Sequence, residues 1–75
     1  MKKYRLVRED YDGTQKTVSQ SNNIHYLNKR MRDLWWAVLE KCRETNVDTV
    51  GNFFVNEYAK LSGVAVWMIL ENNQA

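Results

Sequence analysis

The feature that most limits the fold of this chain is a long amphipathic segment at its centre. Trp35 and Leu39 widen an apolar stripe that a helix would place on one side. Its main members recur at intervals of three and four residues: Ile24, Leu27, Met31, Leu34, Val38 and Cys42. Polar residues 19–23 supply candidate N-caps. We predict a helix from about residue 23 to about residue 44, roughly 33 Å long at the usual helical rise.

A β-hairpin is predicted before this helix. Two short segments of strand-like composition flank Asp12-Gly13, a pair favoured in type I′ turns. With this pair at the centre of the turn, Val7 faces Val18, and an apolar pair of this kind favours the register.

The last third of the chain has two interpretations. Residues 53–61 fit either a strand or a second helix that ends at Gly63. Residues 64–70 are rich in β-branched and aromatic side chains, which predicts a central strand buried on both faces. The 75-residue chain is then a single α+β domain of two layers, with the helix packed on an antiparallel sheet. The expected core is Leu6, Leu27, Met31, Leu34, Val38, Phe53, Val66 and Ile69.

Catalytic and metal-binding residues are few. The single histidine, His25, and the single cysteine, Cys42, fall on the same predicted helix, about 25 Å apart at its usual rise, so they cannot act as a nucleophile and base pair. No ligand spacing for a metal and no glycine-rich phosphate loop is recognisable. We therefore expect a protein that is not an enzyme and that uses no cofactor or metal, and we expect Cys42 to be a core residue.

The predicted helix carries a basic and aromatic strip beside its apolar stripe. Its members are His25, Lys29, Arg32, Trp36 and Arg43. Lysine and arginine neutralise phosphate or acidic side chains, and an exposed tryptophan anchors a partner. The other interpretation is an ordinary solvated helix face, with Trp36 folded against a neighbouring segment. Of the two adjacent tryptophans, Trp36 is the one expected to be exposed.

The distribution of charge and the size of the chain guide the expected function. Residues 1–44 hold ten basic and six acidic side chains, whereas residues 45–75 hold one and three. The net charge of +2 is small for a nucleic-acid-binding domain. We expect a small cytoplasmic protein, of the kind found among phage and mobile-element regulators, that binds and inhibits a macromolecule. A protein partner is favoured over nucleic acid, a homodimer is a further alternative, and no membrane association is expected because the apolar run is too short.

Residues 57–69 resemble the helix-turn-helix of bacterial repressors, because Ala59, Gly63 and Ile69 have its spacing. The resemblance implies two helices near residues 57–72, the second of which would enter the major groove of DNA. The side chains on that second helix would be apolar, including Val66 and Met68, and such side chains cannot read base edges. Nucleic-acid binding, through this motif or through the helix strip, is the alternative function.

Overall fold

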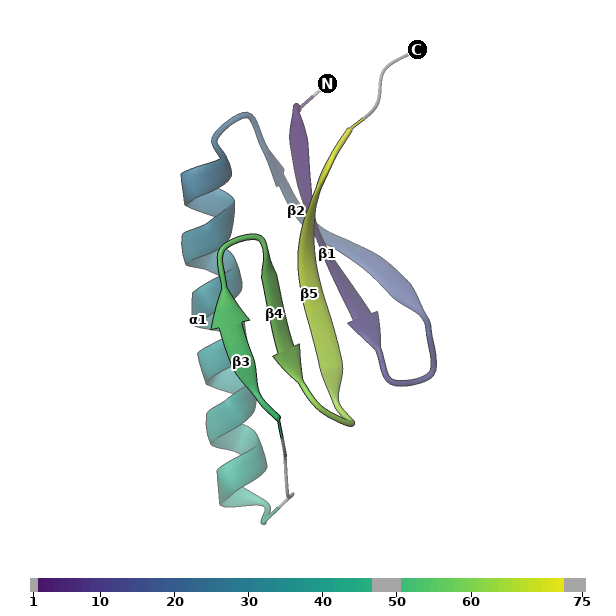
Figure 1. The fold of residues 1–75 in the computed structure, drawn as a ribbon, viewed down its shortest axis with the longest axis vertical. Coiled ribbons are helices and arrows are strands. Elements are labelled where there is room, and N and C mark those ends of the chain that lie inside the picture. The colour runs from purple at the N-terminus through teal and green to yellow at the C-terminus, as the bar shows by residue number, and fades with distance from the viewer. Residues whose placement is uncertain (1, 47–50, 73–75) are drawn as a thin grey trace.

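The protein folds into an antiparallel sheet with a helix along one of its faces (Figure 1). The structure is a computed structural model that describes residues 2–46 and 51–72. Its elements are β1 (Tyr4–Asp10), β2 (Gln15–Ser21), α1 (Ile24–Glu44), β3 (Phe53–Val55), β4 (Tyr58–Leu61) and β5 (Ala65–Glu71). The strand order is β2-β1-β5-β4-β3, so the first and last strands pair at the centre of the sheet. This arrangement confirms the predicted α+β fold of two layers.

The helix agrees closely with its prediction, and local side chains explain its ends. Asn23 precedes the first turn, and its side-chain oxygen accepts hydrogen bonds from the backbone N–H groups of His25 at 3.0 Å and Tyr26 at 3.3 Å. These bonds satisfy donors that an uncapped helix would leave free. At the other end, the backbone N–H of Thr45 donates to the carbonyl of Lys41. No helix in the described residues has the length and apolarity needed to cross a membrane.

The N-terminal hairpin is present, but the predicted register at its tip is wrong. The N–H of Gly13 donates to the carbonyl of Asp10 at 2.9 Å, so the turn is centred one residue earlier than Asp12-Gly13. Gly13 follows this turn with φ +89°, a conformation that favours glycine. Val7 consequently faces Thr17 and not Val18. A bulge between Leu6 and Val7 then shifts the pairing by one residue toward the open end of the hairpin.

The Asp12 side chain at the tip of this hairpin is held by a hydrogen bond from the nearby backbone. The carboxylate of Asp12 accepts a hydrogen bond from the backbone N–H of Thr14 at 2.9 Å. This bond stabilises the ionised form and lowers the pKa of the Asp12 carboxyl group.

Residues 53–61 form strands, which confirms the strand alternative over the helical one, but they form the two strands of a second hairpin and not one continuous strand. The chain reverses at Asn56 and Glu57, and Glu57 has φ +72°. Ala59 therefore pairs with Phe54 across the hairpin instead of continuing the same strand. The helix-turn-helix interpretation is also wrong, because β4 and β5 are strands. The alternation of buried and partly exposed side chains along β5 has the two-residue period of a strand.

The core lies between α1 and one face of the sheet, and it differs from the prediction at two positions. Its buried members are Leu6, Leu27, Met31, Trp35, Leu39, Ala59, Leu61, Ala65 and Trp67, and Leu34, Val38 and Ile69 pack against them. Phe53 is 41% exposed, and Phe54 packs on the core in its place. Val66 lies on the opposite face of the sheet, because its neighbours Ala65 and Trp67 point toward α1. The last strand is central, as predicted, but α1 covers only one of its faces.

We expect Gly13→Ala to lower the free energy of unfolding by about 1–2 kcal/mol, because a Cβ is disfavoured in the left-handed region. There is space for a Cβ at this position, so the loss reflects backbone strain alone. Gly13→Asn should lose less, since asparagine tolerates this conformation better. Urea unfolding followed by tryptophan fluorescence measures both variants. An alanine variant as stable as the parent would contradict the observed turn.

Candidate binding pocket between helix and hairpin

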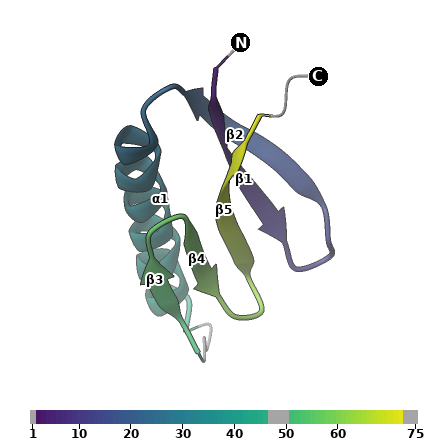
Figure 2. The same cartoon turned by 45° about the horizontal axis from the view of Figure 1, so that its top comes forward.

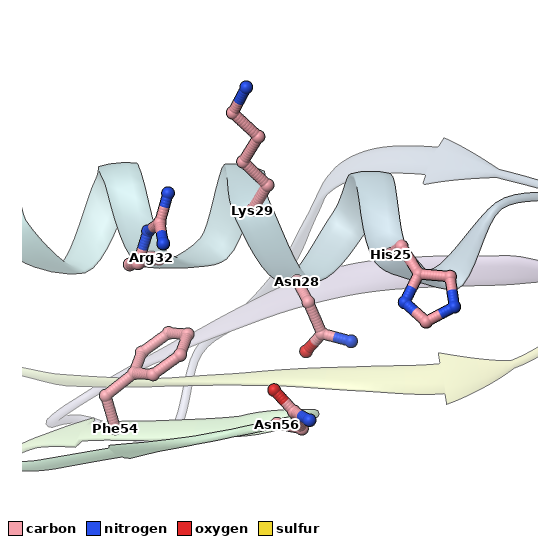
Figure 3. A pocket seen from close by; sticks show the side chains of 6 residues that line it. All are labelled: His25, Asn28, Lys29, Arg32, Phe54 and Asn56. Atoms are coloured by element: carbon pink, nitrogen blue, oxygen red, sulfur yellow. The ribbon is translucent and has the colours of Figure 1, made fainter.

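Three residues of the predicted strip line a shallow pocket between α1 and the β3–β4 hairpin. They are His25, Lys29 and Arg32, all of which are exposed. The pocket has a volume of about 270 Å³ and is completed by Asn28, Phe54 and Asn56. Figure 3 shows that Phe54 and Asn56 rise from the hairpin toward the helix, whereas the Lys29 side chain extends away from it. We call this site the helix–hairpin pocket.

Asn28 fixes the distance between the two walls of the pocket. Its side-chain oxygen accepts a hydrogen bond of 2.7 Å from the backbone N–H of Glu57 at the tip of the hairpin. Its side-chain nitrogen donates to the carbonyl of Ile24 at 3.2 Å. The carbonyl of Glu57 also accepts from the backbone N–H of Ile69 at 3.0 Å. The hairpin tip is thus tied both to the helix and to the central strand.

Trp36 follows the pocket residue Arg32 by about one turn of the helix, and its indole ring packs against the buried ring of Trp35. The ring is 47% exposed, whereas that of Trp35 is only 8% exposed, which confirms the expected difference between them. The two rings meet edge to face, with centroids 5.2 Å apart. Trp35 is itself held by a 3.0 Å hydrogen bond from its Nε1 to the carbonyl of Lys60 and lies 5.9 Å from the ring of Phe54. Trp36 is therefore an exposed aromatic ring on a fixed support.

Arg43 is separated from the other members of the strip. It is exposed, but it lies seven residues beyond Trp36, about 10 Å farther along the helix at the usual rise. It does not line the helix–hairpin pocket. The strip thus divides into three pocket residues, an adjacent tryptophan and a distant arginine.

The positive charge at the pocket is not neutralised by ion pairs. Among the described residues, the side-chain ion pair is Arg8–Asp10, with Nε and Oδ1 2.8 Å apart. Lys29 and Arg32 thus project their charges into solvent, and Asp33 is the acidic neighbour of Arg32 on the helix. A carboxylate or phosphate group of a partner would find these cations available.

The single histidine and the single cysteine lie far apart on α1. His25 is exposed at the start of α1, and Cys42 is buried near its end, which confirms that Cys42 is a core residue. At the usual helical rise they lie about 25 Å apart. The described residues contain no group of three or more His, Cys, Asp or Glu side chains placed to hold a metal ion.

Sequence reasoning missed half of the pocket. Phe54 and Asn56 lie more than twenty residues beyond the helix residues that they face, and only the pairing of β3 with β4 brings them there. A second hollow, of about 300 Å³, was also missed. Arg8, Lys16, Thr17, Val18, Leu34 and Trp67 line it. The guanidinium of Arg8 there lies over the Trp67 ring at 5.3 Å and is paired with Asp10, so this hollow offers less free charge.

We expect Asn28→Ala to lower the free energy of unfolding by about 1 kcal/mol, because the N–H of Glu57 loses its acceptor. Amide hydrogen exchange at Glu57 should become faster in this variant. Asn28→Asp, which keeps an oxygen at the same place, is the matched control and should retain the protection. Unchanged exchange in the alanine variant would show that the bond does not hold the hairpin.

Comparisons with known proteins give no additional guide to this site. No protein-family model matches the chain, and searches of curated proteins and of solved structures found no match either. A function must therefore be argued from the geometry and chemistry of the residues themselves.

Proposed function

We propose that this chain is a small non-enzymatic binding protein that occupies an acidic surface of a partner protein and thereby inhibits it. The observation that carries the proposal is Trp36, which is 47% exposed and supported edge-on by Trp35. A tryptophan held in one orientation loses little conformational freedom on binding. Tryptophan and arginine are also the residues that most often dominate the energy of protein interfaces.

The cations beside Trp36 determine the kind of partner. Lys29 and Arg32 are exposed and enter no ion pair within the described residues. Aspartate and glutamate side chains on a partner would pair with them, and the polar pocket wall formed by Asn28 and Asn56 would accept further hydrogen bonds. Such complementary charges speed association and set the orientation of the two proteins.

A protein partner accounts for this surface better than nucleic acid does. The net charge of the chain is only +2, and Asp33, Glu40 and Glu44 lie on the same helix as the basic strip. A phosphate backbone would meet these carboxylates along the helix. A smaller acidic patch that is centred on Trp36 and Arg32 would avoid most of them.

The test is an affinity capture with nuclease-treated extract of the source cells, followed by quantitative mass spectrometry. We expect a protein that is retained by the parent chain and lost by at least tenfold with Arg32→Ala/Trp36→Ala, since hot-spot truncations cost about 2 kcal/mol or more each. Lys41→Ala is the matched control, because Lys41 lies about 160° around the helix from His25. Circular dichroism checks that all variants fold.

Two outcomes would contradict the proposal. Normal capture by the double variant would show that this surface is not the site. Loss of every captured protein after nuclease treatment, together with steep salt-dependent binding to single-stranded DNA or RNA, would show that the ligand is nucleic acid.

A further inference from the structure

The face of the sheet that α1 does not cover carries an apolar row across all of its strands. Cross-strand pairing connects Val55 to Tyr58, Tyr58 to Met68, Met68 to Val7, and Val7 to Thr17. Side chains of directly paired residues lie on the same face, so these five residues form one row from β3 to β2. Figure 2 shows the helix on the other side of the sheet.

Only part of this row is exposed: its members on β3 and β4 are open to solvent, whereas Val7 on β1 is 2% exposed. Val55 is 52% exposed and Tyr58 is 38% exposed, and Phe53 beside them is 41% exposed. Phe53 and Tyr58 stack with their ring centroids 5.6 Å apart. Val66, Met68 and Leu70, on the same face of β5, are only partly buried and lie outside the core cluster. The exposed part of this face, around Phe53, Val55 and Tyr58, is where a partner could make apolar contacts.

A charged row runs beside the apolar one. Its pairing connects Phe53 to Lys60, Lys60 to Val66, Val66 to Glu9, and Glu9 to Gln15. Lys60 thus lies on β4, which is next to β5 on one side, and Glu9 lies on β1, which is next to β5 on the other side. Both residues belong to the same row. The two charges are opposite in sign and equally distant from the central strand.

We infer that this face binds a second copy of the chain, with a two-fold axis that runs along β5 between the two sheets. Rotation about that axis places β5 of one copy over β5 of the other and exchanges the two sides of the sheet, so β4 of one copy lies over β1 of the other. Lys60 of each copy then faces Glu9 of the partner copy, and Tyr58 faces Val7. Packed sheets are about 10 Å apart, a gap that lysine and glutamate side chains together span.

An axis perpendicular to the strands would place each strand over its own copy. Where that axis passes through the row of Lys60 and Glu9, each of these charges meets its own copy, which disfavours that arrangement. Both arrangements keep the strand directions of the two sheets aligned, so the strand angle does not distinguish them. About an axis along β5, Lys60 and Glu9 are therefore complementary to each other.

The size of the face predicts a weak dimer. At about 4.8 Å between strands and about 3.3 Å per residue, the five strands present a projected area on the order of 450 Å². Stable interfaces usually take about 800 Å² of accessible surface from each partner. The dimer should consequently dissociate on dilution, while the folded monomer persists.

Analytical ultracentrifugation over a range of concentrations tests the inference by charge reversal. Lys60→Glu and Glu9→Lys should each weaken the dimer by about tenfold or more, because symmetry repeats each new repulsion twice. The double variant Glu9→Lys/Lys60→Glu should restore it. These two residues are not cross-strand partners within one copy, so the exchange leaves the pairing inside each monomer unchanged.

Two further variants show whether dimerisation depends on this face of the sheet or on the surface beside the helix–hairpin pocket. Val55→Lys should prevent dimerisation by placing a charge in the apolar row, whereas Trp36→Ala should leave it unchanged. The inference is overturned if the parent chain is still monomeric at about 1 mM, where a dimer of millimolar affinity would be half formed. It is equally overturned if both single reversals dimerise like the parent, or if the double reversal fails to recover.

Discussion

The packing of α1 against one face of the sheet is the interaction on which the rest of the structure depends. Trp67 on the central strand is the largest of the fully buried side chains, and it belongs to the same cluster as Leu27, Met31 and Trp35 of the helix. A chain of this length can build only one such core. Every strand is paired to a neighbour, but the apolar burial that holds the sheet and the helix together comes from this one layer.

A one-sided core leaves two kinds of surface with different chemistry. The outer flank of the helix, next to the β3–β4 hairpin, combines free cations with a supported tryptophan. The uncovered face of the sheet is largely apolar, and Lys60 and Glu9 on it lie symmetrically about β5. A dimer formed through that face would carry its two helix–hairpin pockets on outward-facing sides. Such an arrangement would allow a multivalent partner to bind with higher avidity than either pocket alone provides.

Predictions that depended on interactions within a few residues were more accurate than those that depended on contacts between distant segments. The long helix was predicted to within a residue at each end, because its periodicity and the Asn23 cap act within a few positions. The hairpin tip was shifted by one residue, since Asp12-Gly13 also fits a turn in which glycine follows the central pair. Phe53 was assigned to the core and Phe54 was not, because a reversal at Asn56 and Glu57 changes which side of the strand faces α1.

The sequence by itself determined the α+β class, the helix with its basic and aromatic strip, the position of the last strand and the burial of Cys42. These properties depend on local spacing and capping, which can be read along the chain. Only the tertiary structure decided that Phe54 and Asn56 complete a pocket with His25 and Arg32, and that Lys60 and Glu9 lie symmetrically about β5. Those juxtapositions arise from strand order and register, and pairing between distant segments is set by the packing of the whole domain and by no local signal.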